Sequence, residues 1–214
     1  MNDNQSVLIF LKGGVEMAKT ANKKELILES AYDIFKEKGL EDTRVSQIVK
    51  NAGIAQGTFY LYYNSKMDVL PDLAQQIISN YTQYLTEHGD VKAGLDINLR
   101  LAIDRIFEVN QEDRTIPSIV YAGITRSGDV DKWKVIYRPL YDLIADYLEA
   151  AKENGEIRED INSSYYSEFV ISLIESTARG LILFQHTSEE VEKYKEELSS
   201  FILNAVSWAP VKVV

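Results

Sequence analysis

The chain has 214 residues, of which 45% are hydrophobic and 26% charged, and it contains no cysteine. This composition is typical of a globular protein of one or two domains, and the lack of cysteine excludes disulfides and thiolate chemistry. No apolar run approaches the roughly 20 residues needed to span a bilayer, and the apolar segment 6–11 lacks the small-residue cleavage site of a secretory signal. We therefore expect a cytoplasmic protein that does not bind membranes.

Acidic residues are concentrated in the second part of the chain. The net charge is −10, but residues 1–70 contain nine basic and nine acidic side chains, so the whole excess lies in residues 71–214. A protein that binds DNA needs positive charge only at its contact face. An acidic remainder would repel the duplex and so favour contact through the neutral N-terminal part.

Residues 1–17 are predicted to be a disordered leader or a non-native start. Met17 is followed by AKTANKKE, and Lys12-Gly13-Gly14 can be encoded by AAAGGAGG, a bacterial ribosome-binding sequence. We therefore expect translation to start at Met17, and the alternative is a genuine but disordered N-terminus. The intact mass of the protein from its native host distinguishes the two.

The N-terminal part then shows the pattern of two helices joined by a turn. Apolar residues recur at helical spacing over about 23–38, and Gly39 is expected to end this helix. The next helix is predicted to begin after Asp42 or Thr43, since both are good N-caps, and to end at Gly53. Such a pair, followed by a short third helix, is typical of a helix-turn-helix.

The third helix spans about 56–62 and would be offered to the DNA major groove. Phe59 and Tyr63 lie one turn apart and are expected to face the core. Leu61 lies on the opposite face among polar and small residues, which is unusual for a solvated surface but suits a thymine methyl group. The hydroxyl of Tyr60 is expected to reach a DNA phosphate.

Further side chains around this helix have properties that suit DNA contact. Gln56 can read adenine through two hydrogen bonds or donate to a phosphate, and Gly57 lets the backbone approach closely. The hydroxyl of Tyr62 can reach a phosphate on the other side of the groove. Arg44 and Lys66 stand at helix starts, where the helix N-terminus also attracts phosphate.

Together these residues resemble the N-terminal domain of the TetR family of bacterial transcriptional regulators. The similarity runs from Lys23 to about Leu70, and it includes Ala31–Phe35, Lys38-Gly39, Thr43, Val45, Ile48-Val49, Ala52-Gly53-Ile54, Gly57-Thr58-Phe59-Tyr60, Tyr63, Ser65-Lys66 and Val69-Leu70. The resemblance implies operator contact by residues matched at Thr43, Gln56, Gly57, Thr58, Tyr60, Tyr62 and Lys66, to which the residues themselves add Arg44 and Leu61. Ala55 stands where the family often has a small polar residue that caps the recognition helix, so the operator sequence is not predicted.

The rest of the chain is helical almost throughout. Ser65 is expected to cap a fourth helix that runs to about residue 88, with Asp68 completing a variant of the capping box. Further helices are predicted over about 95–110, 116–126, 130–154, 163–186 and 188–208, and no segment alternates for long enough to be a strand. The predicted fold is all-α with about nine helices, in which a helix-turn-helix head (18–66) continues through its fourth helix into a larger effector-binding and dimerisation body (67–214).

The last two helices are predicted to form a dimer interface. Apolar residues surround the helix over 165–184, so it must be buried on more than one side, and the final helix carries an apolar stripe. The two could form a four-helix interface with a symmetry mate, which would present two heads about 34 Å apart to a pseudo-palindromic operator. The alternative is that both helices serve only the core of one chain. The predicted interface residues are Tyr166, Val170, Ile174, Leu181, Tyr194, Leu198, Phe201 and Ile202.

The middle helices are rich in aromatic and branched residues that could line an apolar cavity with a few polar tips. The resemblance implies a small-molecule effector at such a position, although each side chain taken singly also suits an ordinary core. The predicted pocket residues are Ile106, Phe107, Tyr121, Ile124, Trp133, Tyr137, Tyr141 and Phe169. A coupling of about 1–3 kcal/mol between this pocket and the heads would change operator affinity roughly 5- to 150-fold.

No catalytic or metal-binding motif is present in the sequence. The only histidines are His88 and His186, and acidic neighbours such as Glu189-Glu190 diverge around their helix. We therefore expect no enzymatic activity, no catalytic residue, no metal and no cofactor. The predicted function is a homodimeric, effector-responsive DNA-binding regulator, a repressor released from its operator by a small, largely apolar ligand. The alternative is a small-molecule-binding or protein-interaction module with a vestigial DNA head.

Overall fold

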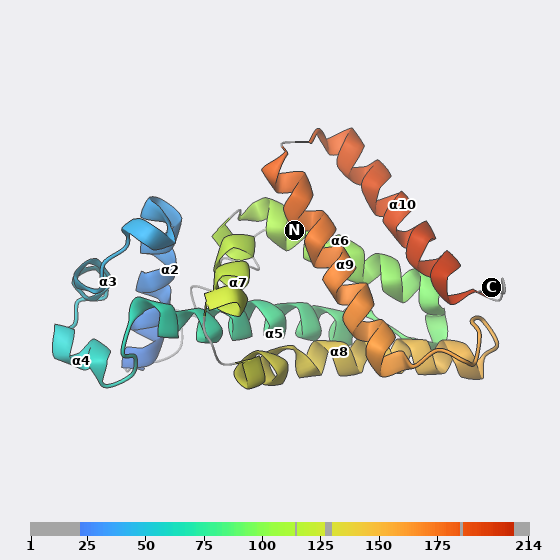
Figure 1. Ribbon diagram of the computed structural model, residues 1–214, viewed down its shortest axis with the longest axis horizontal. Helices are drawn as coiled ribbons and strands as arrows, with labels where there is room; N and C mark the ends of the chain where they lie inside the picture. Colours follow the sequence, from blue (N-terminus) through green and yellow to red (C-terminus); the bar gives the residue numbers. More distant parts are fainter. Residues whose placement is uncertain (1–21, 114, 127–129, 185, 208–214) are drawn as a thin grey trace. The chain divides into compact units, whose positions relative to one another are not determined.

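The structure is a computed structural model that describes residues 22–113, 115–126, 130–184 and 186–207. Within these ranges it contains nine α-helices, two short 3₁₀ helices and no strand (Figure 1), which confirms the predicted all-α class. No helix in the described ranges is both long enough and apolar enough to cross a membrane. The expected translation start at Met17 lies outside the described residues.

The helices lie close to their predicted positions and differ mainly at their ends. In chain order they are α2 (Lys23–Asp42), α3 (Val45–Asn51), α4 (Gln56–Tyr60), η2 (Lys66–Val69), α5 (Leu70–His88), η3 (Val91–Ala93), α6 (Leu95–Glu112), α7 (Thr115–Arg126), α8 (Val130–Glu153), α9 (Ser163–Leu183) and α10 (Ser188–Val206). The recognition helix α4 ends two residues earlier than predicted, because Tyr62 and Tyr63 both bond back to the carbonyl of Phe59 in a tight turn.

The chain forms two compact units. The first comprises residues 1–80 and 115–136, and the second comprises residues 81–114 and 137–214. Helices α5 and α8 therefore contribute to both units. The head predicted over 18–66 falls within the first unit, which also includes α7.

In the first unit, α2 packs against α3, η2 and α7, and α3 packs against α4. The buried hydroxyl of Ser30 donates to the carbonyl of Ile48 at 2.6 Å, which ties α2 to α3. Gly39 breaks the helical path of α2 at φ 79°, and Gly53 follows α3 at φ 66°, so both predicted glycine stops are confirmed. These left-handed conformations are strained for residues with a Cβ atom.

The predicted N-cap of α3 is wrong by one or two residues. Arg44 occupies the N-cap position of α3, and its backbone N–H donates to the side chain of Gln47 at 2.8 Å. Thr43 instead closes the end of α2, because its buried hydroxyl donates to the carbonyl of Gly39 at 2.7 Å. Thr43 is a good helix cap by residue type, but here the hydroxyl serves the preceding helix.

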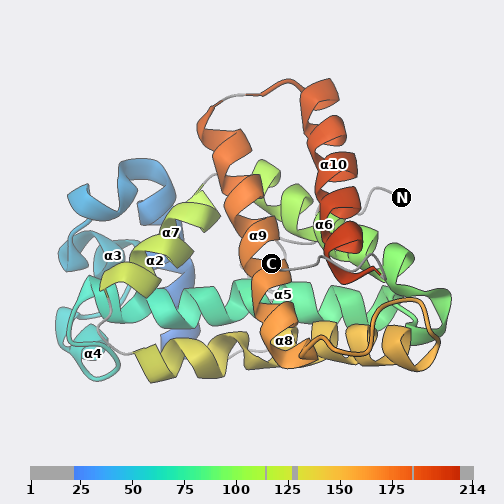
Figure 2. The same cartoon turned by 45° about the vertical axis from the view of Figure 1, so that its right-hand side comes forward.

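In the second unit, α6 packs against both α9 and α10 (Figure 1 and Figure 2). The buried core of this unit includes Ile103, Ile106 and Ile174. Tyr147 ties α8 to α5, since its hydroxyl donates to the carbonyl of Leu85 at 3.0 Å. This unit thus has its own core and could hold a buried polar group away from water.

Candidate DNA-binding surface and body site

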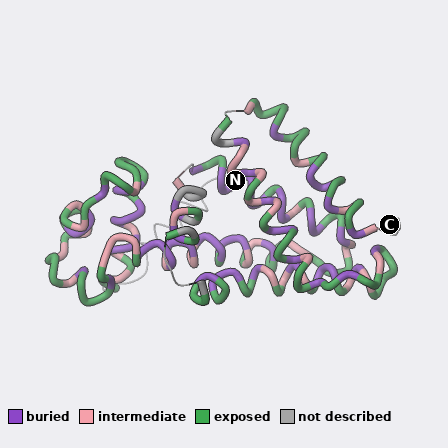
Figure 3. The backbone as a smooth tube through the Cα atoms, in the orientation of Figure 1, coloured by how far each residue is buried: buried purple, intermediate pink, exposed green. Residues whose placement is uncertain are grey.

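Helix α4 has one buried face and one exposed face (Figure 3). Phe59 is fully buried and Tyr63 nearly so, with their ring centroids 5.7 Å apart, which confirms their predicted place in the core. On the other side Leu61 is 82% exposed, with Tyr60 at 49% and Tyr62 at 43%. Three large side chains with an apolar part therefore stand together in solvent on one short segment.

The N-terminus of α4 lacks a side-chain cap and is exposed. Ala55 is its N-cap residue and makes no side-chain cap hydrogen bond, and the backbone N–H of Thr58 donates to the carbonyl of Ala55 at 2.9 Å. Gln56 and Gly57 are exposed and Thr58 is half-buried. A Cβ atom built on Gly57 would meet nothing within 4 Å. Nothing inside the chain explains a glycine at this position, so the space is available to an external partner.

Lys66 has a structural role that the sequence did not predict. Its ammonium group donates to three backbone carbonyls at the end of α2, those of Leu40, Glu41 and Thr43, at 2.6, 2.7 and 2.8 Å. An ammonium group has three donors, so all of them are used within the head. A phosphate contact by Lys66 stays a prediction, and it would require the loss of at least one of these bonds.

The other two predicted basic or polar contacts outside α4 differ from each other. Arg44 is exposed, as a phosphate contact requires. The side chain of Thr43 is only 2% exposed and its hydroxyl is bound to Gly39. A contact between the Thr43 side chain and DNA therefore does not fit this structure, because the hydroxyl caps α2.

Asp72, near the start of α5, joins three other side chains in the first unit. The hydroxyl of Tyr63 donates to its carboxylate at 2.8 Å, Lys24 forms an ion pair with it at 2.8 Å, and Lys132 lies at 3.8 Å. Burial opposes ionisation of Asp72, but the hydrogen bonds from Lys24 and Tyr63 outweigh it and lower the pKa of the carboxyl. The sequence analysis missed Asp72. The available signal was the hydroxyl of Tyr63, since the tyrosine hydroxyl usually finds a partner when the ring is buried.

A second ion pair links α7 to the head. The guanidinium of Arg126, at the end of α7, donates to the carboxylate of Glu41, and this bond lowers the pKa of Glu41. Both side chains are exposed. Exposed pairs contribute little to stability, so this bond marks where α7 meets α2 and does not hold the unit together.

The eight predicted pocket residues fall into both units. In the first unit, Trp133 is buried and Tyr121 and Ile124 are about half exposed. In the second unit, Ile106, Phe107 and Tyr137 are buried, Tyr141 is half-buried and Phe169 is 63% exposed. Their role in binding a ligand stays a prediction.

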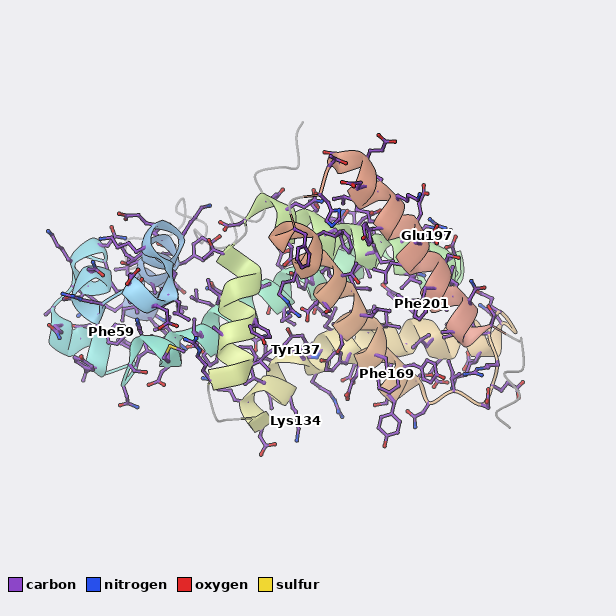
Figure 4. All side chains as sticks on the ribbon, turned by 45° about the horizontal axis from the view of Figure 1, so that its top comes forward. Phe59, Lys134, Tyr137, Phe169, Glu197 and Phe201 are labelled. Carbon is purple, nitrogen blue, oxygen red and sulfur yellow. The ribbon has the colours of Figure 1, made fainter. Side chains whose placement is uncertain are left out.

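A polar cluster that the sequence analysis did not predict lies in the second unit around Glu175 of α9. The hydroxyl of Tyr137 lies 3.1 Å from both carboxylate oxygens of Glu175, and Tyr141 stacks on Tyr137 with ring centroids 5.4 Å apart. Tyr137 is labelled in Figure 4. Desolvation raises the pKa of Glu175 to about 7, although the hydrogen bond from Tyr137 and the charge of Arg179 act in the opposite direction.

The charge of Glu175 affects the pKa of three tyrosines of this unit. Burial, followed by the charge of Glu175, raises the pKa of Tyr81, Tyr137 and Tyr141. Tyr81 is held by Asn110, whose side-chain amide donates to the tyrosine hydroxyl at 3.1 Å. The cluster thus consists of one carboxylate surrounded by phenol groups.

Of the eight predicted dimer residues, five are buried, Tyr166 is partly buried and two are exposed. Five of them are already 0–7% exposed in the single chain: Val170, Ile174, Leu181, Leu198 and Ile202. We assign these five to the core of the second unit, because a helical stripe shows that a face is buried but not what covers it. Tyr194 and Phe201 are exposed, and so are Tyr165 and Phe169 on α9, which the dimer prediction omitted. Figure 4 labels Phe169 on α9 and Phe201 on α10.

Comparison with known proteins identifies the family. The family model described as "Bacterial regulatory proteins, tetR family" matches residues 27–73, and that described as "Tetracyclin repressor-like, C-terminal domain" matches residues 99–206. YvdT of Bacillus subtilis (strain 168), described as an uncharacterized HTH-type transcriptional regulator, is 33% identical over 193 residues, which cover 89% of this chain and 98% of the relative. The chain belongs to the TetR family. It is therefore a helix-turn-helix transcriptional regulator, as its resemblance implied.

A further relative and two solved structures extend the comparison. The fatty acid metabolism regulator protein of Bacillus subtilis is 25% identical over 159 residues, which cover 73% of this chain and 82% of the relative. The structure of FadR from Bacillus subtilis in complex with stearoyl-CoA matches with a TM-score of 0.71 at 22% identity, covering 85% of this chain and 98% of that one. FadR from Thermus thermophilus in complex with lauroyl-CoA matches with a TM-score of 0.67 at 19% identity, covering 89% and 98%. At these identities the two structural matches establish the shared fold.

Proposed function

We propose that this TetR-family regulator is a homodimeric repressor that leaves a pseudo-palindromic operator when a small, largely apolar ligand binds to its body. It would act in the cytoplasm by binding alone, without enzymatic activity. The observation that carries the proposal is the outer face of α4, where Leu61 is 82% exposed and Gly57 is uncrowded. Neither side-chain position is filled by another described residue, and both suit close approach to the floor of a DNA groove.

The dimer is supported by exposed aromatic residues on the last two helices. Tyr165 and Phe169 on α9 and Tyr194 and Phe201 on α10 are 44–64% exposed. Large exposed apolar groups that gather on neighbouring elements mark interaction surfaces. In a homodimer with two-fold symmetry, the same surface of each copy would cover them.

An apolar ligand is supported by the relatives. The FadR structures from Bacillus subtilis and Thermus thermophilus contain stearoyl-CoA and lauroyl-CoA, and both compounds carry a long apolar chain. This chain shares their fold. A ligand that binds the DNA-free form more tightly would then shift the population away from the operator.

The substitution Gly57→Ala tests the DNA-binding part. Duplexes are first selected from a random pool by the full-length protein, and affinity is then measured by fluorescence anisotropy over a range of salt concentrations. The added methyl meets nothing in the chain, so we expect unfolding free energy to stay equal or rise by about 0.5–1 kcal/mol. DNA affinity should fall at least about tenfold, because the methyl group separates the helix from the groove.

Two results would contradict this part of the proposal. Unchanged DNA affinity of Gly57→Ala would show that the face does not meet DNA. Failure of the wild-type protein to select any duplex would favour the alternative, a binding module with a vestigial head. A repressor also predicts a log–log salt dependence with negative slope, since cationic contacts release counterions from DNA.

A further inference from the structure

We propose that the body of this regulator binds an organic cation, whose charged group pairs with Glu175 while its apolar part packs against the neighbouring tyrosines. The inference rests on the proposed function, because it names the chemical class of the effector. Glu175 and its neighbours Tyr137 and Tyr141 all lie in the second unit, so the site is built within one compact part of the chain.

The carboxylate of Glu175 has few hydrogen-bond donors among the described residues. An ionised carboxylate offers about four acceptor positions, and in the described part of the chain its one hydrogen-bond donor is the hydroxyl of Tyr137, shared between the two oxygens. No ion pair joins Glu175 to a cationic side chain among the described residues. The charge of Arg179, one turn further along α9, also acts on Glu175 and lowers its pKa. Most of the acceptor positions are therefore open to a ligand that donates.

Tyrosine rings lie near the carboxylate of Glu175. The ring of Tyr137 stacks on that of Tyr141, and the charge of Glu175 also acts on Tyr81. The face of a tyrosine ring attracts a cation, and this attraction grows when the site excludes water. A positively charged ligand group is thus attracted both by the carboxylate of Glu175 and by the faces of the tyrosine rings.

The sign of the ligand charge follows from electrostatics. A carboxylate in a dehydrated site is costly unless it is paired, and a cation relieves that cost. An anionic head group placed beside Glu175 would add repulsion between like charges. The Glu175 residue as a whole is partly buried in the single chain.

Three compounds of equal chain length test the inference: dodecylamine, dodecanol and dodecanoate. Their binding to the full-length protein is measured by isothermal titration calorimetry at pH 8, where the amine is protonated. We expect the amine to bind at least about tenfold more tightly than the alcohol, and dodecanoate to bind most weakly. Glu175→Gln should weaken amine binding about 30-fold or more and leave the alcohol within about threefold. Glu197→Gln, an exposed acid on α10 (Figure 4), is the matched control and should leave all three unchanged.

Each outcome separates this inference from the proposed function. Equal affinities for amine and alcohol, or an amine preference that survives in Glu175→Gln, would overturn the cation site. Tighter binding of dodecanoate or lauroyl-CoA would also overturn it, while the proposed release by an apolar ligand would stand. Amine binding that depends on Glu175 but does not weaken the complex with selected DNA would overturn its role as effector. Failure to select DNA, with Glu175-dependent amine binding intact, would reject the repressor and leave the site.

Discussion

Replacing Glu175 with glutamine should stabilise the protein at pH 8 and have much less effect at pH 5. Glutamine has nearly the same shape and can still accept the hydrogen bond from Tyr137, but it carries no charge. The pKa of Glu175 is raised from 4.5 to about 7 in the folded chain, chiefly by desolvation. Between these values the folded state binds a proton that the unfolded state has released, so this group's stabilising contribution is full below pH 4.5 and is lost as the pH rises through 7.

The size of the effect follows from the pKa difference. A shift from 4.5 to about 7 corresponds to roughly 3 kcal/mol at most, at about 1.36 kcal/mol per pKa unit. Part of this range lies below pH 5, so the stability difference between wild type and Glu175→Gln should change by about 2–3 kcal/mol between pH 5 and pH 8. The side-chain amide of glutamine brings two donors that also need partners, which lowers the gain at pH 8 to about 1–2 kcal/mol.

Urea denaturation at the two pH values measures this directly. Protein concentration is kept constant, since association would add to apparent stability. Glu197→Gln is the control, because Glu197 is exposed on α10 and a surface change of this kind alters stability by about 0.5 kcal/mol or less. A difference between wild type and Glu175→Gln that is the same at both pH values would refute the reasoning, as would a loss of stability at pH 8.

Four further outcomes are expected. Tyr63→Phe should lower the unfolding free energy by about 1–2 kcal/mol, because it removes the hydrogen bond to Asp72; thermal denaturation measures it. Asp72→Asn should reduce the loss of stability on acidification. The pKa of Asp72 is lowered in the folded chain, so its charge stabilises the fold at a pH above the pKa of an ordinary aspartate, and this stability is lost as the pH falls through the pKa of the folded state. Lys66→Met should lower the unfolding free energy by about 1–3 kcal/mol, because it leaves three carbonyls without a charged donor. Lys134 is exposed on α8 (Figure 4), so the control Lys134→Met should change the unfolding free energy by about 0.5 kcal/mol or less. Phe169→Asp combined with Phe201→Asp should convert the particle to a monomer in light scattering with its helical circular dichroism intact, and an unchanged dimer would move the interface elsewhere.

The Lys66 prediction changes how DNA-binding variants are interpreted. The sequence places Lys66 among the phosphate contacts, so a variant that loses DNA binding would support that contact. In the structure its ammonium group holds the end of α2, so the same result would follow from damage to the head. Gly57→Ala avoids this ambiguity, because its methyl group would crowd no other part of the described chain within 4 Å.

Local pattern accounts for what could be predicted from the sequence. Helical periodicity and glycines at Gly39 and Gly53 set the first helices, and the spacing of Phe59 and Tyr63 is enough to identify the buried face of α4. These features depend on neighbours within one turn. The same is true of the capping residue Asp68, whose carboxylate accepts from the backbone of Ser65 at 3.0 Å.

Long-range pairing accounts for what was missed. The partners of Lys66 lie 23–26 residues earlier in the chain, and Tyr137 lies 38 residues before Glu175. A lysine near a helix start is typical of both a phosphate contact and a cap for another helix, and its sequence neighbours do not distinguish the two. Glu175 carried one usable signal: it follows Leu173 and Ile174 in a helix whose apolar residues lie on more than one side, and a charged residue that is buried must find a partner or shift its pKa.

Asp72 joins three parts of the first unit, because its carboxylate pairs with Lys24 of α2 and accepts the hydrogen bond from Tyr63, and Lys132 of α8 lies 3.8 Å away. The Lys132 pair is partly exposed and so contributes about 1 kcal/mol or less. A change in this pair alone is therefore too weak to carry an allosteric coupling of about 1–3 kcal/mol. Coupling of that size requires that the bonds from Lys24 and Tyr63 to the same carboxylate also change. Tyr63 lies one turn from Phe59 of α4, so Asp72 is the residue of the first unit through which such a change would reach the recognition helix.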